Sequence, residues 1–475
     1  MLFNSLEFLI FLPLCFIVYW FVLNRSLKLQ NFFILVASYV FYGWWDYRFL
    51  SLIALSTVVD YLIGDLLSKQ DSASSRKGLL LTSLVVNLGL LGFFKYYNFF
   101  IDSWISAWSG LGVEMHASTL NIVLPVGISF YTFQTLSYTI DIYRKKLEPS
   151  KSFVNFAAYV AFFPQLVAGP IERATNLLPQ FSRKRNFTFE QGKSGFYLII
   201  WGLFKKVVIA DNCAFFVNQI FENHTAYSAG ELWMGAILFA FQIYGDFSGY
   251  SDIAIGTARL FGFDLMTNFK FPYFSKNIGD FWRRWHISLS TWFRDYVYIP
   301  LGGSKGSVWK QVRNVFIIFI VSGFWHGANW TFIVWGAFHA LLFIPLLLIK
   351  RNRSDVNTTG ISLLDVVRIF MTFILVTLGW IYFRADSITI ANEYIMSLLG
   401  SDLFEARLFI KTSKNLLLFA ICLFSILCML LFETRAYVKA RTEVQLNMLS
   451  GIFIVLCIFL MGAFKDPSQF IYFQF

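Results

Sequence analysis

Long apolar runs are the feature that most restricts what this chain can fold into. Many of them hold roughly 18 or more residues, the length at which an apolar helix crosses the hydrocarbon core of a bilayer. The chain is 57% hydrophobic and 14% charged, whereas about a quarter of a typical soluble domain is charged. The alternation of apolar and polar residues that is typical of membrane β-barrels does not dominate. We therefore predict an all-α, polytopic membrane protein with about 11–13 transmembrane or re-entrant helices.

The apolar runs also predict where the helices lie. No linker or internal repeat divides the chain, so we expect a single domain over residues 1–475, with its polar motifs at about 120–350. Three apolar stretches are less regular than the others, at 153–170, 281–300 and 315–349. Regular membrane-spanning helices are expected at about 6–23, 31–45, 49–67, 79–101, 120–140, 194–220, 232–262, 363–384, 413–432 and 447–464.

The loops between these helices differ in their content of basic residues. One set contains 28 Lys and Arg, and the opposite set contains 4. Because cytoplasmic loops carry the excess of Lys and Arg, this difference predicts that the N-terminus lies outside. It also accounts for the net charge of +11 without a nucleic-acid partner. The stretches 153–170 and 315–349 begin and end at basic loops, so each is expected to be a re-entrant element, a helical hairpin or a pair of half-spans.

His326 lies inside the last of these stretches and is bracketed by Gly323 and Gly327. A charged side chain at membrane depth costs roughly 2.5 kcal/mol or more, so an ionisable residue there is a candidate functional residue. Histidine can stay neutral and still accept a proton near neutral pH, which suits a general base. The two glycines would let another helix or a ligand approach the backbone closely. The alternative is a structural histidine that bonds a backbone carbonyl at a helix break.

Three neighbours of His326 are candidates for the same site. Asn329 can bond an imidazole or a carbonyl oxygen, and Trp325 flanks the histidine directly. His339 follows His326 by 13 residues, which places it about 140° away on a continuous helix. His339 can therefore join the site only if the chain bends near residues 327–331.

A second histidine, His286, lies in a segment that predicts an amphipathic helix at the cytoplasmic interface. Arg283 and Arg294 are expected beside its aromatic face, and His286 at the border. The segment could anchor the protein in lipid headgroups, or it could form a cationic wall for an anionic donor such as a nucleotide or phosphopantetheine phosphate. Both interpretations stay open. The face itself comprises Trp282, Trp285, Leu289, Trp292, Phe293 and Tyr296.

Two carboxylates, Asp246 and Asp252, lie in the apolar run 232–262 and should be paired or line a wet cavity. We consider them candidate substrate- or donor-binding residues, and the alternative is a structural ion pair with Arg259 or Arg283. The two remaining histidines, at positions 116 and 224, are expected to be solvated in loops outside the membrane. No His or Cys pair has the spacing of metal ligands, and phosphate-loop and serine-hydrolase motifs are missing, so no metal site is expected.

Six stretches together resemble the motifs of a known family. They are residues 162–171 (FFPQLVAGPI), 246–252 (DFSGYSD), 280–290 (DFWRRWHISLS), 294–303 (RDYVYIPLGG), 324–330 (FWHGANW) and 470–475 (FIYFQF). They resemble the membrane-bound O-acyltransferase (MBOAT) family, most closely its bacterial branch for polysaccharides such as alginate. The family pairs a histidine with a second polar residue (His, Asn or Asp) about 40 positions upstream, and His286 lies 40 positions before His326.

The resemblance implies a ring of helices around a central tunnel in the cytoplasmic (inner) membrane of a bacterium. It implies transfer of an acyl group, most simply acetyl, across the membrane for O-acetylation of an exported polysaccharide, with His326 and His286 as the catalytic pair. The donor would be acetyl-CoA or another acyl thioester, as a substrate and not as a bound cofactor. A separate extracytoplasmic (periplasmic) acetyltransferase would be the partner. Transfer of D-alanine to teichoic acid, a transporter or flippase of the donor or glycan, and a structural scaffold are the alternatives.

Overall fold

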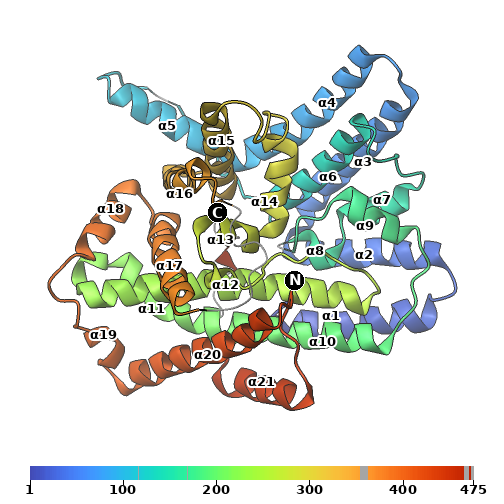
Figure 1. Cartoon of the computed structure of the whole chain (residues 1–475). Coiled ribbons are helices and arrows are strands. Elements are labelled where there is room, and N and C mark those ends of the chain that lie inside the picture. Colours follow the sequence, from blue (N-terminus) through green and yellow to red (C-terminus); the bar gives the residue numbers. More distant parts are fainter. Residues whose placement is uncertain (116, 168, 353–361, 465–469, 472–475) are drawn as a thin grey trace. The chain divides into compact units, whose positions relative to one another are not determined.

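The computed structural model describes residues 1–115, 117–167, 169–352, 362–464 and 470–471, which form helices and no strand (Figure 1). This confirms the prediction of an all-α, polytopic membrane protein. Among the described residues, the helical segments that are long and apolar enough to cross a membrane are Leu27–Lys69, Ala73–Ser109, Trp330–Leu348, Leu363–Arg384 and Ser413–Val438. Shorter apolar helices lie at Leu6–Val22, Phe153–Leu166 and Met448–Met461.

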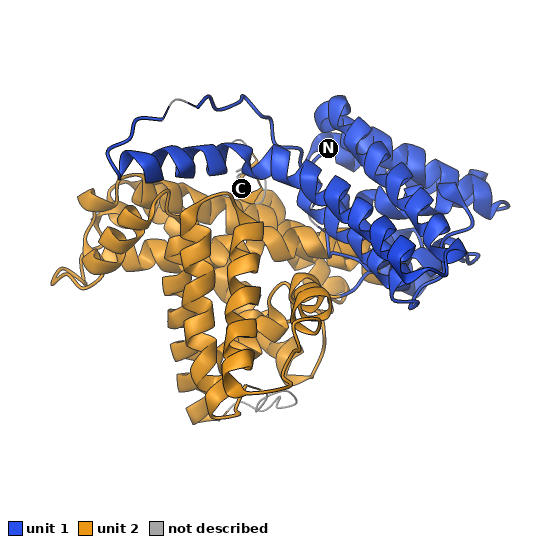
Figure 2. Ribbon diagram, turned by 90° about the horizontal axis from the view of Figure 1, so that it is seen from above, with its two compact units in different colours: residues 1–193, 257–266 blue, residues 194–256, 267–475 orange. Residues whose placement is uncertain are grey.

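The described chain forms two compact units, which Figure 2 distinguishes by colour. Unit 1 comprises Met1–Lys193 and Thr257–Met266, and unit 2 comprises Ser194–Gly256 and Thr267–Phe475. The single domain and the central tunnel stay predictions. All ten expected spans contain helix, but 120–140 is helical only from Ile128 and 447–464 only over Met448–Met461, whereas several others run beyond the expected ends.

Unit 1 contains the helices up to the start of α10. They are α1 (Leu6–Ile17), α2 (Leu27–Asp46), α3 (Leu50–Lys69), α4 (Ala73–Leu91), α5 (Tyr97–Ser109), α6 (Ile128–Tyr143), α7 (Phe153–Val160), α8 (Phe163–Leu166) and α9 (Ala174–Phe181). The irregular stretch 153–170 is broken as expected, because α7 ends at Val160 and Pro164 lies in the first turn of α8.

A single arginine joins three helices of unit 1. Arg76 on α4 is buried and donates hydrogen bonds to the carbonyl oxygens of Leu67 and Gln70, at the end of α3, and of Ile142 and Tyr143, at the end of α6. The last carbonyls of a helix have no partner within it, and they carry a partial negative charge. The guanidinium therefore satisfies both helix ends at once.

Unit 2 contains most of α10 (Phe189–Leu203), most of α12 (Ala229–Leu260) and the remaining helices. They are α11 (Asp211–Glu222), α13 (Ile278–Arg284), α14 (Ile287–Phe293), α15 (Val308–His326), α16 (Trp330–Leu348), α17 (Leu363–Arg384), α18 (Ile388–Ser397), α19 (Arg407–Ile410), α20 (Ser413–Val438) and α21 (Met448–Met461). A π-helical segment, Phe204–Ala210, joins α10 to α11, and another, Arg294–Tyr298, follows α14.

Helices α15 and α16 form a hairpin (Figure 1). For the stretch 315–349 the sequence left open a re-entrant element, a helical hairpin or a pair of half-spans, and the structure shows the helical hairpin. α15 ends at His326, and α16 begins at Trp330. The two helices approach most closely where Gly323 faces Gly336, since a Cβ atom on either glycine would overlap a backbone carbonyl of the other helix. The membrane side that the turn faces stays a prediction.

The segment around His286 differs from the continuous helix that the sequence predicts. α13 ends at Arg284, and α14 begins at Ile287. Between them His286 adopts a left-handed conformation, with φ of 43° and ψ of 55°. The prediction that this aromatic face lies at the membrane interface is also wrong in part. Four of its residues are buried inside the protein, namely Trp285, Leu289, Trp292 and Phe293. The break turns these rings inward, where they pack against other aromatic side chains.

The hairpin predicts a large effect of a small substitution. In Gly323→Ala the new methyl group would collide with the carbonyl oxygen of Phe332, so α15 and α16 would have to move apart. We expect a lower melting temperature of the detergent-solubilised protein and a reduced level in the membrane.

Gly78→Ala is the matched control, because the same methyl group on α4 meets nothing within 4 Å. An alanine stabilises an exposed helix relative to glycine by about 1 kcal/mol, so this variant should be as stable as the natural protein or more stable. Equal stability of the two variants would contradict the close approach.

Candidate active site

The structure brings His286 and His326 together within unit 2. Their ring centroids lie 6.4 Å apart, although the residues come from different helices. Both side chains are buried, with 0% and 3% of their surfaces exposed. Burial away from water disfavours a charged imidazole, so both rings are expected to be neutral at rest.

Asn268 holds His286 in one orientation. Its Oδ1 accepts hydrogen bonds from the backbone N–H of Ser288 (3.2 Å) and from the Ser288 hydroxyl (2.8 Å), and it lies 3.1 Å from His286 Nδ1. Since a backbone N–H can only donate, this atom is the amide oxygen, and His286 Nδ1 must carry the proton. The neutral ring therefore has its lone pair on Nε2.

Aromatic side chains enclose His326. Ring centroids of Trp325, Trp335 and Phe383 lie 5.0, 5.1 and 5.3 Å from that of the histidine. Trp335 comes from α16 and Phe383 from α17, so three helices of unit 2 contribute to this surrounding. The His326 ring is therefore surrounded by aromatic side chains, and burial away from water strengthens electrostatic interactions at this position.

The expected bend after His326 is present, and it brings His339 to the same aromatic cluster. Trp335 contacts both histidines: its ring centroid lies 5.1 Å from that of His326 and 5.0 Å from that of His339. Both ring nitrogens of His339 are buried without a hydrogen-bond partner among the residues that the structure describes. A Cβ atom at Gly379 would come within 2.9 Å of His339 Nε2, so the ring is tightly confined. A chemical role of His339 stays a prediction.

A cavity of about 740 Å³ in unit 2 combines cations with an aromatic wall. Arg283, Arg294 and Lys350 supply the positive charges. Trp282, Phe319 and Phe343 belong to the apolar lining, and Trp282 and Phe319 also contact His339. The other described residues of the lining are Gly279, Ser290, Phe293, Tyr298, Ser304, Gln311, Val315, Ile318, Ser322, Leu347 and Asn352.

The two predicted arginines of this cavity have different surroundings. Arg283 donates a hydrogen bond of 2.5 Å from Nη1 to the carbonyl oxygen of Asn352. Arg294 forms an ion pair of 2.7 Å with Asp295, and the hydrogen bond to this carboxylate raises the pKa of Arg294 above its ordinary value. Both arginines line the same cavity, and their binding of an anionic donor stays a prediction.

Asn329 acts as a helix cap in the structure. Its Oδ1 accepts a hydrogen bond of 3.0 Å from the backbone N–H of Thr331, and its Nδ2 donates to the carbonyl oxygen of Asp386 at 2.9 Å. These contacts fix the start of α16 directly after the hairpin turn. The predicted substrate contact of Asn329 is thus in competition with a local structural role.

Asp246 and Asp252 form ion pairs with two consecutive lysines that the sequence analysis did not consider. Lys206 Nζ lies 2.7 Å from Asp246 and 2.8 Å from Asp211, and Lys205 Nζ lies 2.7 Å from Asp252. Both lysines belong to the π-helical segment Phe204–Ala210. Neither aspartate lies in the lining of the 740 Å³ cavity. Their predicted role in binding substrate or donor is therefore untested, and the ion pairs favour the structural alternative.

The prediction that His224 is exposed to solvent was wrong. The residue is 8% exposed, and its Nε2 lies 3.3 Å from the Glu393 carboxylate. His116 lies outside the described residues. A search of the described residues finds no group of three or more His, Cys, Asp or Glu that could hold a metal ion.

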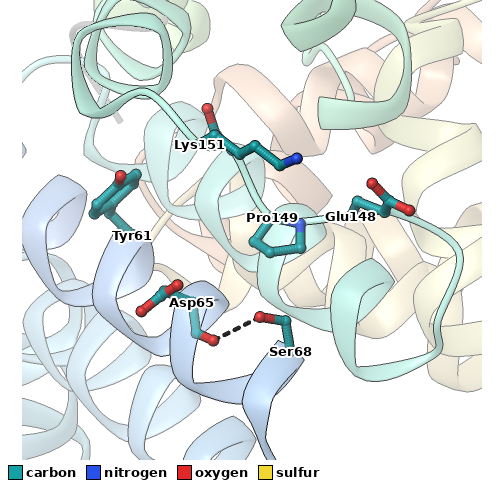
Figure 3. A pocket seen from close by; sticks show the side chains of 7 residues that line it. Tyr61, Asp65, Ser68, Glu148, Pro149 and Lys151 are labelled. Atoms are coloured by element: carbon teal, nitrogen blue, oxygen red, sulfur yellow. Dashed lines mark hydrogen bonds between the residues drawn. The ribbon is translucent and has the colours of Figure 1, made fainter.

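Unit 1 has a cavity of its own, of about 520 Å³ (Figure 3). Tyr61, Asp65 and Ser68 come from α3, and the loop before α7 supplies Glu148 and Lys151, together with Pro149 and Ser150. None of the predicted site residues lies in this lining.

Sequence reasoning missed two residues of the histidine site, Asn268 and Trp335. Asn268 stands between Thr267 and Phe269, at a position distant from both histidines in the sequence, and no local pattern distinguished it. Trp335 was hidden among the many aromatic residues of its run, although it follows His326 by nine residues.

Comparison with known proteins assigns this chain to a family. The model of the membrane-bound O-acyltransferase family matches residues 144–385, about half of the chain. The chain belongs to the membrane-bound O-acyltransferase family. It is therefore a membrane enzyme that transfers acyl groups to hydroxyl oxygens, and the matched range contains both histidines and the large cavity.

Similar proteins extend the match beyond the family model. The chain is 42% identical over 400 residues to a probable alginate O-acetylase, AlgI, of Pseudomonas syringae pv. tomato, which covers 83% of this chain and 74% of the relative. It is 35% identical over 430 residues to a peptidoglycan O-acetyltransferase of Helicobacter pylori, with 84% and 80% covered. A teichoic acid D-alanyltransferase of Bacillus subtilis is 30% identical over 242 residues, which cover 48% of this chain and 60% of the relative.

The orientation of His286 can be tested in this O-acyltransferase. In Asn268→Ala, His286 Nδ1 loses its acceptor and the ring can turn, so we expect acyl transfer to fall by at least tenfold. The measurement is acyl transfer in isolated membranes, normalised to the amount of protein.

Ser288→Ala is the control, because it removes a hydroxyl that lies 2.8 Å from the same Asn268 oxygen and 3.4 Å from His286 Nδ1, and it leaves the contact between Asn268 and His286. It should retain most of the activity. Full activity of Asn268→Ala would show that the orientation of His286 is unimportant.

Proposed function

We propose that this protein transfers an acetyl group from a cytoplasmic thioester to an exported polysaccharide, with His326 as the general base. The observation that carries the proposal is the pair of buried histidines, His286 and His326, 6.4 Å apart within the sequence range that defines the family. The names of two relatives, an alginate O-acetylase and a peptidoglycan O-acetyltransferase, support both an acetyl group and a glycan acceptor.

The 740 Å³ cavity is the proposed donor site. Its cations, Arg283, Arg294 and Lys350, suit the phosphates of coenzyme A or of a carrier protein's phosphopantetheine. Its aromatic wall, which includes Trp282 and Phe319, suits the apolar arm and the acyl group. The thioester, acetyl-CoA in the simplest case, enters as a substrate, and the proposed reaction uses no bound cofactor.

The chemistry needs one base and no covalent enzyme intermediate. Neutral His326 takes the proton of the acceptor hydroxyl as its oxygen attacks the thioester carbonyl carbon. The lone pair on His286 Nε2 stabilises the imidazolium that forms beside it. When the tetrahedral intermediate collapses, the carbon–sulfur bond breaks, and His326 returns the proton to the thiolate.

The distribution of charge supports a direction of transfer. The basic loops would face the cytoplasm, with the N-terminus outside, so the donor enters from inside and the acceptor from outside. Such an arrangement fits the inner membrane of a bacterium. A separate extracytoplasmic acetyltransferase would then work together with this protein in the acetylation of the polysaccharide.

Transfer of D-alanine to teichoic acid is the second candidate, because a D-alanyltransferase is among the relatives. That match covers 48% of the chain, against 83% for the alginate O-acetylase. Mass spectrometry of the ester released from the cell's glycans distinguishes acetate from alanine. A protein that only transports the donor or the glycan would form no ester when purified.

The base assignment predicts the effect of removing each histidine. His326→Ala should lower O-acetylation of the cell's glycan by about 10²–10⁴-fold, because general-base catalysis contributes that much. His286→Ala should also lower it strongly. The measurement is glycan-bound acetate per amount of membrane protein.

His224→Gln controls for the loss of a buried histidine outside the site and should retain activity. Acetylation at the natural level in His326→Ala would refute the base assignment.

The donor site predicts a change in apparent affinity. Removing one cation in Arg283→Gln should raise KM for acetyl-CoA by roughly tenfold, since a hydrogen bond to a charged group contributes about 1.5–3 kcal/mol. The maximal rate should change less, because the arginine contacts the donor far from the reacting carbon.

Arg407→Gln is a suitable control, since Arg407 is exposed and lies outside the cavity lining. An unchanged KM for acetyl-CoA in Arg283→Gln would show that the phosphates of the donor bind elsewhere.

A further inference from the structure

Trp335 carries a buried hydrogen-bond donor that nothing in the described structure uses. The side chain is 0% exposed, and its Nε1–H has no hydrogen-bond partner among the described residues. An indole nitrogen can only donate, so it needs an acceptor. A buried donor without one costs about 1–3 kcal/mol, and such a group in a native protein has a reason, often a catalytic one.

The position of Trp335 connects the donor cavity with His326. Trp282, which lines the cavity, lies 5.6 Å from Trp335 in an edge-on arrangement. The centroid of the Trp335 ring also lies 5.1 Å from that of His326, with the ring planes at 88°. Trp335 therefore contacts both a residue that lines the cavity and the proposed base.

The reaction needs a donor at this point. When the hydroxyl oxygen attacks, the thioester carbonyl oxygen becomes an oxyanion, which must be stabilised. The neutral ring of His286 cannot serve, because Asn268 holds the proton on Nδ1 and leaves a lone pair on Nε2. The Asn329 amide is also engaged, since its Nδ2 donates to the carbonyl oxygen of Asp386.

We propose that Trp335 Nε1–H donates a hydrogen bond to the oxyanion of the tetrahedral intermediate. This role rests on the proposed function of His326. The acceptor hydroxyl gives its proton to His326 as the new carbon–oxygen bond forms, and the carbonyl electron pair moves to the oxygen that Trp335 binds. When that pair returns, the carbon–sulfur bond breaks and the thiolate takes the proton from His326.

The test replaces the indole by a ring without the donor. Trp335→Phe retains an aromatic side chain, and incorporation of benzothienylalanine at this position replaces only the N–H by sulfur. In both variants the rate of acetyl transfer should fall on the order of 10²–10³-fold, as it does when an oxyanion donor is lost. The assay uses the purified full-length protein, acetyl-CoA and polysaccharide isolated from the same cells.

Binding separates this role from a structural one. S-ethyl coenzyme A is a thioether that lacks the carbonyl oxygen, so its affinity should be the same for Trp335→Phe and for the natural protein. A loss of rate together with a parallel loss of affinity or of melting temperature would overturn the proposal, because it would indicate damage to the site.

Trp380→Phe is the matched control. Trp380 is also fully buried, and its ring is stacked on Trp335 with the ring centroids 5.8 Å apart. We expect the natural rate in this variant.

The natural rate in Trp335→Phe, with His326→Ala inactive, would overturn the oxyanion role and leave the proposed function intact. An active His326→Ala would instead contradict the proposed function itself.

Discussion

The close approach of α15 and α16 is the contact on which the histidine site depends. Gly323 and Gly336 let the two backbones meet, and the turn after His326 follows from that approach. Trp335 reaches His326 only because α16 returns along α15. In lipid, helices associate through van der Waals packing more than through the hydrophobic effect, so two facing glycines determine the geometry more strongly than they would in water.

Much of this architecture was accessible from the sequence. The long apolar runs indicated helix in all ten expected spans, because a membrane leaves the backbone few alternatives to a helix, although the helix expected from residue 120 begins only at Ile128. The basic residues at both ends of 315–349 indicated an element that returns, and the hairpin agrees with it. The 40-residue spacing selected His286 as the neighbour of His326, and the two rings are close. Helical periodicity also led to the expectation that Arg283 and Arg294 lie close to one another.

The errors have physical reasons. The wheel for residues 281–295 assumed one regular helix, and sequence periodicity does not reveal a single left-handed residue within it. The partners of Asp246 and Asp252 were missed because Lys205 and Lys206 lie more than 35 positions away, on a π-helical segment. Contacts that join distant segments leave no local pattern. Asn268 was missed for the same reason, although it fixes the proton on His286.

The backbone at His286 has a consequence for which residues can occupy that position. With φ of 43°, it lies in the left-handed region, which most side chains avoid. Besides glycine, the residues enriched there are Asn, Asp and His. These are the same three that the family pattern permits upstream of its histidine. Tolerance of a left-handed main chain and the ability to exchange hydrogen bonds therefore favour the same short set of residues at this position.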